Sequence, residues 1–319
     1  MATKNIKSST AVLNPIATKV IEGLRQSMNS KIIDMVSWIK GKAEAEAIAR
    51  KTPSLNALSD LDPNHAVYMH SMNTLSEYVE SICQLPAVKK ITDLYAKAED
   101  EYIPQGPPMS PLTKTYFSCW GLLDLSVGKG RESFATIVLD LCHYLNMDAH
   151  TIQVYQILTK SRMGFYVHQG LSGKTISFRE IITNKEIKAI CPAGYLGKKG
   201  EIWFARIFPP PFEGVAQYSI VFTTPYVIGE IESQYAFKTG SEKSWLEFFD
   251  RNLNKTKIAD PVASYEHFMK YGLNPNYWSE YIFVSFVNFQ SDMIMCAGFP
   301  DIQASMPHTD EGMKRLGLS

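Results

Sequence analysis

The first half of the chain places apolar residues every three or four positions, which is the spacing of an amphipathic helix. The pattern begins after Asn14 and Pro15, two residue types that favour the start of a helix. The same spacing recurs over residues 62–84 and 131–145. We therefore expect a helical domain over residues 1–160.

A proline-rich segment separates the second and third of these helices. Four prolines fall between Pro104 and Pro111. Because proline lacks a backbone N–H and has a fixed φ, this run excludes a helix interior or a central strand. We expect a stiff connector here.

The spacing shortens after Arg162. Five runs rich in β-branched and aromatic residues follow, separated by Gly, Asn or Pro, and they predict a small antiparallel sheet or barrel. Helical spacing returns over residues 241–253 and 260–272. In the second of these helices, Asp260 is expected to cap the start and Gly272 to end the element.

These patterns together predict an α+β protein with a helical N-terminal half. A small antiparallel β module follows over about residues 162–230, and a mixed helical tail completes the chain. The second domain is then residues 161–319, packed on the first.

Glycines concentrate in the stretch CPAGYLGKKGEIWFARIFPPPF, residues 191–212. If the runs 185–191 and 200–208 are neighbouring strands, its three glycines, Gly194, Gly197 and Gly200, lie in a hairpin connection. Positive φ angles in such a connection favour residues without a Cβ. Hairpin geometry is then sufficient to explain the glycines.

Arg206 is an exception in the second of these strands, which is otherwise apolar on both faces. An unpaired buried guanidinium is costly, so we expect a carboxylate partner, with a position at the rim or a bound ligand as alternatives. Glu180 and Glu201 are the nearest candidate partners.

Basic residues outnumber acidic ones by seven to three between Lys174 and Arg206. Two aromatic residues lie among them, and a basic surface with aromatic side chains is suited to single-stranded nucleic acid. The candidate binding residues are Tyr195, Lys198, Lys199, Trp203 and Arg206. The alternative interpretation is a solvated sheet face with a Trp in the core.

Composition narrows the function classes. The 319 residues include 32 basic and 32 acidic ones, so no overall charge attracts the protein to nucleic acid or anionic membranes. The five cysteines are scattered and never form C-x-x-C, which argues against a disulfide framework and a zinc ribbon. We expect a cytoplasmic protein without a transmembrane segment, cofactor or metal site.

Motifs for catalysis are incomplete. Residues 168–175 approach a phosphate loop, but a strand rather than a helix follows. Glu186 and Lys188 form the E-x-K of many nucleases without a nearby aspartate. A base such as His168 with carboxylates from the tail, or with Cys191 and Glu266, requires convergence in the fold.

Several segments resemble an uncharacterised family of bacterial proteins over about residues 101–308. They are YIPQGPPMSPLTKTYF, SRMGFYVHQG, CPAGYLGKKGEIWFARIFPPP, TTPYV and GFPDIQASMPH. The resemblance implies no assigned reaction. ISFREIITNKEI is also similar to a β module found beside other bacterial domains, although Glu180 and Asn184 replace its usual acidic and glycine positions.

The sequence thus predicts a non-catalytic interaction or scaffold protein that binds another macromolecule through its β module. The alternative is a hydrolase, nuclease-like in one version, with a site assembled only in three dimensions. Expected partners are another protein or a second copy, with the aromatic segment 275–289 as a candidate contact. Single-stranded nucleic acid is a further candidate, and no membrane is expected.

Overall fold

The computed structural model describes residues 14–29, 58, 60–102, 111–214, 216–233, 236–239, 241–272, 284–287 and 294–297. The predicted proline-rich connector falls almost entirely outside these ranges. Of the aromatic segment 275–289, only the strand at 284–287 lies inside them.

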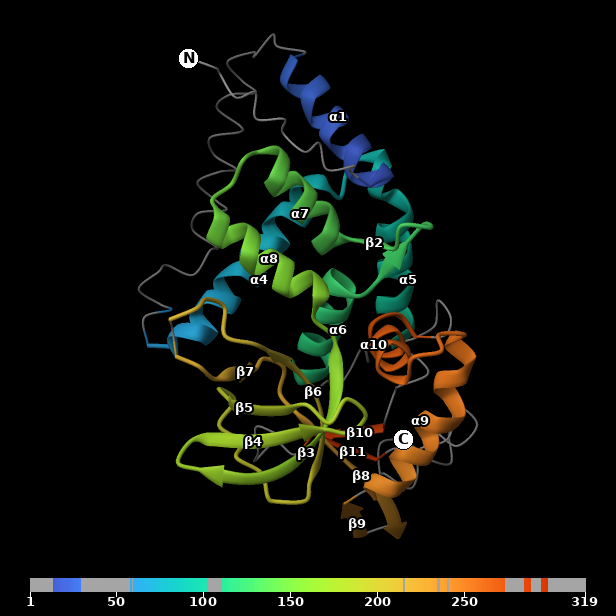
Figure 1. The fold of residues 1–319 in the computed structure, drawn as a ribbon. Coiled ribbons are helices and arrows are strands. Elements are labelled where there is room, and N and C mark those ends of the chain that lie inside the picture. Colours follow the sequence, from blue (N-terminus) through green and yellow to red (C-terminus); the bar gives the residue numbers. More distant parts are fainter. Residues whose placement is uncertain are drawn as a thin grey trace, which may run out of the picture.

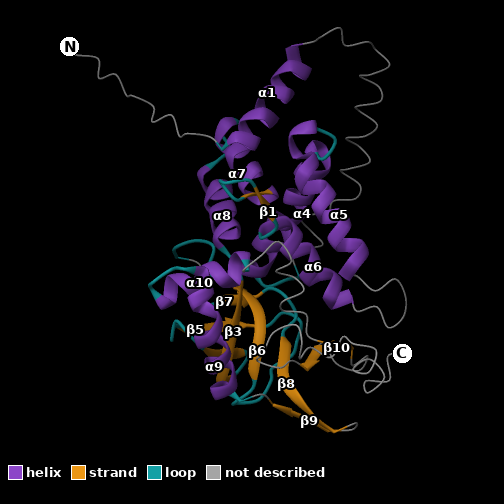
Figure 2. Ribbon diagram, turned by 90° about the vertical axis from the view of Figure 1, so that its right-hand side faces the viewer, coloured by secondary structure: helices purple, strands orange, loops and turns teal. Residues whose placement is uncertain are grey.

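The first half is helical, as the apolar spacing predicts. We call α1 and α4–α8 the helical body, which lies above the strands in Figure 2. Its elements are α1 (Pro15–Asn29), α4 (Pro63–Ile82), η1 (Pro86–Val88), α5 (Lys89–Tyr102), α6 (Pro111–Leu123), the short pair β1 (Ser126–Val127) and β2 (Glu132–Ser133), α7 (Phe134–Tyr144) and α8 (Ala149–Lys160).

Helix starts are fixed by side-chain caps. The Asp62 carboxylate accepts the N–H groups of Asn64 and His65 at the start of α4, and Ser133 forms a capping box with Thr136 in α7. The start of α1 is capped by a residue far away in the sequence. The buried Glu132 carboxylate accepts the N–H groups of the first turn of α1 at 3.0–3.1 Å. Glu132 thereby joins the first helix to the β1–β2 pair.

The second half contains the strands. They are β3 (Met163–Ser172), β4 (Thr175–Glu180), β5 (Glu186–Ile190), β6 (Ile202–Phe208), β7 (Ser219–Val221), β8 (Tyr226–Ser233), β9 (Ala236–Thr239), β10 (Val284–Val287) and β11 (Ile294–Ala297). Two helices follow β9, namely α9 (Glu242–Leu253) and α10 (Pro261–Tyr271), with η2 (Asn254–Thr256) between them. Asp260 caps α10 and Gly272 ends it, as predicted.

Five strands close into a barrel in the order β3-β4-β5-β7-β6, with β6 returning to β3. The prediction of an antiparallel β module is wrong at one seam, because β5 and β7 run parallel. The strand β3 is shared: its residues 163–167 pair with β6, and its residues 166–172 pair with β4, with a register shift between His168 and Gly170. Outside the barrel, β8 continues the sheet from β6, and the tail contributes β10 and β11 as well as helices.

The predicted hairpin between β5 and β6 is also wrong. β5 pairs with β4 and β7, whereas β6 pairs with β3, β7 and β8. The connection 191–201 therefore crosses one end of the barrel instead of turning between neighbours. Closure of the barrel decides this, because pairing β6 with both β3 and β7 leaves no edge for β5.

β6 has two buried faces, as its apolar pattern predicts. Trp203 and Ala205 face the barrel interior with Tyr166, Phe178 and other side chains of the smaller core cluster. The opposite face joins the main core, where the Phe208 ring lies 4.5 Å from that of Tyr68 on α4. One strand thus joins the barrel to the helical body.

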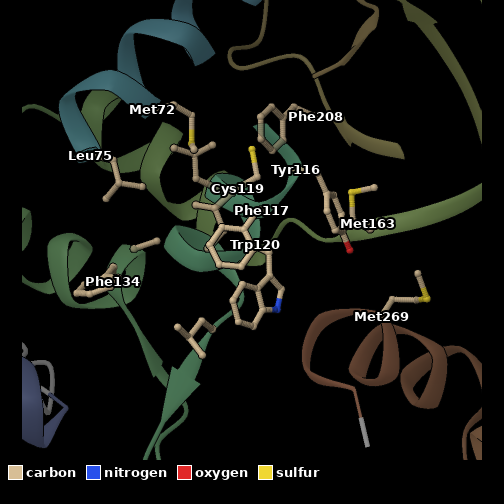
Figure 3. Packing of buried hydrophobic residues seen from close by; sticks show 14 of the residues in the cluster. Met72, Leu75, Tyr116, Phe117, Cys119, Trp120, Phe134, Met163, Phe208 and Met269 are labelled. Atoms are coloured by element: carbon tan, nitrogen blue, oxygen red, sulfur yellow. The ribbon is translucent and has the colours of Figure 1, made fainter. Parts of the chain in front are cut away.

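The main core is centred on α6. Figure 3 shows its Phe117 and Trp120 among side chains from α4, α7 and β6. The same core also includes contacts between the barrel and α9, where the Phe165 ring of β3 lies 4.7 Å from the Trp245 ring. Among the described residues, none of the helices has the length and apolar content needed to cross a bilayer.

Candidate binding surface on the barrel

The barrel is covered unevenly. The helical body and α9 pack on β3 and β6, whereas β4 and β5 lie on the side turned away from α9 and α10 (Figure 1). Alternation along these two strands sends Phe178 and Ala189 inward and leaves the intervening side chains outside. We call the outward side chains the β4–β5 face: Thr175, Ser177, Arg179, Glu186 and Lys188.

Cross-strand pairs organise this face. Ser177 lies opposite Lys188, and Arg179 lies opposite Glu186. The Arg179 guanidinium also donates to Glu242 of α9 at 2.7 Å and to Asn184 at 3.2 Å. Arg179 is therefore held in place at one end of the face, whereas the Lys188 side chain is exposed.

Further lysines surround the face at both ends of the strands. Lys174, in the β3–β4 turn, and Lys185, before β5, are exposed. Lys198 and Lys199, in the connection 191–201, are exposed as well. Within the described residues, no carboxylate forms a salt bridge with these lysines or with Lys188. The described part of the barrel surface thus presents several uncompensated positive charges.

The connection 191–201 carries two of these lysines on a tight turn. The Glu201 N–H donates to Lys198 O at 3.1 Å, and Gly200 has φ +96°. A glycine with positive φ at the third position is typical of a type II β-turn. Lys198 and Lys199 therefore occupy the first two positions of a turn at the barrel end.

Glu201 links this connection to the barrel core. Its carboxylate accepts the Tyr195 hydroxyl at 2.9 and 3.0 Å and the Trp203 indole N–H at 2.9 Å. The Tyr195 and Trp203 rings also lie 5.3 Å apart at 30°. Burial, followed by the carboxylate beside it, raises the pKa of Tyr195 well above its usual range.

The five predicted binding residues are not brought together on one surface. Lys198 and Lys199 are exposed, and Tyr195 is half-buried. Trp203 is fully buried in the barrel core, and Arg206 is fully buried on the opposite face of β6. The prediction missed Lys188 and Arg179, because no sequence pattern marks β4 and β5 as the uncovered side of the barrel.

Arg206 has the carboxylate partner expected for a buried guanidinium, but its identity differs from the prediction. It pairs with Asp124, at the end of α6, instead of Glu180 or Glu201. Burial acts to lower the pKa of Arg206, but the Asp124 carboxylate together with Cys119 and Tyr116 raises the pKa overall. Arg206 also donates to the Ser161 hydroxyl at 2.8 Å.

Lys270 of α10 shares the same carboxylate. Its ammonium donates to Asp124 at 2.8 Å and to the carbonyl oxygens of Leu123 and Ser161 at 2.9 and 2.6 Å. Burial lowers the pKa of Lys270, against the opposing effect of Asp124. Three acceptors nevertheless match the three protons of the charged amine.

Arg162 completes the arrangement. It donates to Glu180 of β4 at 2.6 Å and to Glu266 of α10 at 2.5 and 2.6 Å. Three cations and three carboxylates from the helical body, the barrel and α10 meet here and join these parts. We call them the ionic cluster: Asp124, Arg162, Glu180, Arg206, Glu266 and Lys270.

The residues considered for catalysis have other contacts. His168 is buried in the barrel, where its Nε2 lies 3.0 Å from Leu196 O and its ring packs on Phe178 and Trp203. Glu266 is bound by Arg162 in the ionic cluster. Among the described residues, no group of three His, Cys, Asp or Glu side chains is placed to hold a metal ion.

Comparison with known proteins finds no similar protein. No family model, curated protein or solved structure matches this chain. The resemblance to a bacterial family therefore remains a prediction, and function must be inferred from the barrel itself.

Proposed function

We propose that the protein binds single-stranded nucleic acid on the outer surface of its barrel, with the helical body as a scaffold. This makes specific the interaction role expected from the sequence. The chemistry required is cations for phosphates, together with flat or apolar side chains for bases.

The strand connectivity of the barrel carries the proposal. Numbered along the chain, its five strands have the order 1-2-3-5-4-1, with the third and fifth strands parallel and a long, bulged first strand shared by the second and fourth. This is the connectivity of the oligonucleotide- and oligosaccharide-binding fold, a five-stranded Greek-key barrel. Ligands of that fold bind on the face of its second and third strands, which correspond to β4 and β5.

Charge favours nucleic acid over a neutral oligosaccharide. Lys188 is exposed on the β4–β5 face, with Lys174 and Lys185 at the strand ends. A phosphate backbone supplies a negative charge at each nucleotide, whereas a neutral glycan does not. Half-exposed Ser177 and Thr175 add hydroxyl groups for hydrogen bonds.

A titration with a labelled oligothymidylate of about 16 nucleotides tests the proposal. We expect salt-sensitive binding, because each phosphate that a lysine neutralises releases a counterion. The Lys188→Glu variant should bind about fivefold more weakly, and the slope of log affinity against log salt should fall by about 0.7 for each phosphate that the variant no longer neutralises. The control is Lys90→Glu, the same charge reversal at an exposed position on α5.

A second variant is expected to gain affinity, which misfolding does not produce. Glu242→Gln removes the carboxylate that holds Arg179, so the guanidinium becomes available to a phosphate. We expect affinity to rise a few-fold. Absence of binding by the parent protein at low salt would refute the proposal, and an equal weakening in Lys188→Glu and Lys90→Glu would place the site elsewhere.

A further inference from the structure

The connection 191–201 is built as an ordered element, although it contains three glycines and no regular secondary structure. Its C-terminal end is held to the barrel through His168, whose backbone N–H donates to Glu201 O and whose carbonyl accepts the Gly200 N–H, both at 2.8 Å. In the middle, the His168 ring lies 3.0 Å from Leu196 O. These bonds fix the path of the chain across the barrel end.

Gly197 brings the connection against the core. A Cβ at this position would lie 2.4 Å from the Trp203 ring and 2.7 Å from the Glu201 carboxylate. Its φ is +67°. The backbone therefore packs directly on Trp203, one residue before the exposed Lys198.

Glu201 is the residue on which these interactions converge. Its carboxylate binds Tyr195, which precedes the two lysines, and Trp203, which follows them. A hydrogen bond to a charged acceptor is stronger than one between neutral groups. Because Glu201 is acidic, it offers nothing to a phosphate itself.

We infer that Glu201 is a positioning residue, which holds the 198–201 turn so that Lys198 and Lys199 contact the phosphates of the bound strand. This inference rests on the proposed function and extends its site from the β4–β5 face to the barrel end. It explains why an acidic side chain lies within a basic segment: its carboxylate is turned toward the core and orders the lysines beside it.

The test is the Glu201→Gln variant, studied by two independent measurements. The variant replaces a charged acceptor with a neutral amide, so the hydrogen bonds from Tyr195 and Trp203 become weaker. The amide NH₂ also replaces the second carboxylate oxygen, which accepts from Tyr195, with a donor. The first measurement is the rate of trypsin cleavage after Lys198 and Lys199 in the native protein. We expect cleavage about tenfold faster than in the parent, because proteolysis follows the population of the locally opened connection.

The second measurement is the titration with labelled oligothymidylate over a range of salt. If neither lysine is held against a phosphate any longer, the salt slope should fall by about 1.4. Glu213→Gln is the matched control, since it makes the same change at an exposed glutamate in the β6–β7 connection. It should alter neither measurement.

Tyr195→Phe is a second, milder variant, which tests the same contact if Glu201→Gln fails to fold. It removes one donor to the carboxylate and keeps the ring beside Trp203, so cleavage should accelerate and the salt slope should fall in the same direction. Unchanged cleavage in both variants would overturn the positioning role. Faster cleavage with unchanged oligonucleotide affinity would overturn the contact of the lysines with phosphate.

The two proposals can fail separately. If the parent protein binds no oligonucleotide, the proposed function and the phosphate contact are both refuted, whatever the cleavage rates. If the parent binds and Lys188→Glu weakens binding, but Glu201→Gln matches Glu213→Gln in both measurements, the proposed function stands and the role of Glu201 is refuted.

Discussion

At the scale of single residues, Arg206 shows how a buried charge is accommodated. Its guanidinium is fully buried between the barrel and the helical body and is paired with Asp124. Without Arg206, Asp124 keeps Lys270 as a partner, but the ionic cluster then holds three carboxylates and two cations. Breaking a buried ion pair in this way costs more than the pair itself contributes.

Arg206→Ala is therefore expected to lower the free energy of unfolding by about 3–5 kcal/mol. Urea denaturation measures the change. The control is Arg25→Ala, because Arg25 makes an exposed hydrogen bond with Tyr144 and its removal should cost less than about 1 kcal/mol. Equal stability of the two variants would mean that Arg206 has no structural role.

His65 makes stability depend on pH. Burial lowers the pKa of His65 below its ordinary value, although Asp62 opposes this effect. The unfolded chain therefore takes up a proton at a higher pH than the folded protein does. As pH falls through about 6.5, the free energy of unfolding should decrease, until the folded protein is protonated as well.

The expected result for His65→Gln is a smaller decrease in stability between about pH 7 and pH 5.5. Urea denaturation at several pH values measures the slope. Part of the decrease should persist, because burial and Arg131 lower the pKa of His267 in the same direction. An unchanged slope in the variant would show that His65 does not contribute.

At the scale of elements, the connection 191–201 distinguishes two reasons for a glycine. Gly197 and Gly200 both have positive φ. A Cβ at Gly197 would collide with Trp203, whereas a Cβ at Gly200 would meet no atom within 4 Å. A substitution at Gly200 therefore costs backbone strain alone, whereas one at Gly197 costs backbone strain and a steric collision.

We expect Gly200→Ala to cost about 1 kcal/mol, which is the strain of a positive φ. Gly197→Ala adds overpacking against the barrel core and should cost about 2–4 kcal/mol. Thermal denaturation of the two variants gives the comparison. Equal costs would indicate that the connection moves away from Trp203 without penalty.

At the scale of the whole molecule, the barrel and helical body share one hydrophobic core and the ionic cluster. The main core includes residues of α4, α6, β3, β6 and α10. Arg162, Arg206 and Lys270 connect the same parts by charge. Neither half can open without exposing apolar surface and separating buried ion pairs.

The described parts of the protein should therefore unfold in one cooperative transition. Far-UV circular dichroism, dominated by the helices, and tryptophan fluorescence, to which Trp203 in the barrel contributes, should give coincident urea curves. An earlier transition by fluorescence than by circular dichroism would contradict a single cooperative transition.

The sequence determined the features that depend on neighbours in the chain. Apolar periodicity predicted the helices and the change to strands after Arg162, and proline with aspartate predicted the start of α10. It also predicted that β6 has two buried faces and that Arg206 needs a carboxylate. These results follow from local spacing and from the cost of an unpaired buried charge.

Only the tertiary structure decided which distant segments meet. The sequence could not show that β6 leaves β5 to pair with β3, because strand pairing depends on closure of the whole barrel. It could not identify Asp124, which lies 82 residues from Arg206 along the chain. For the same reason it could not separate the exposed Lys198 and Lys199 from the buried Trp203, since the barrel core alone decides which face of a strand is covered.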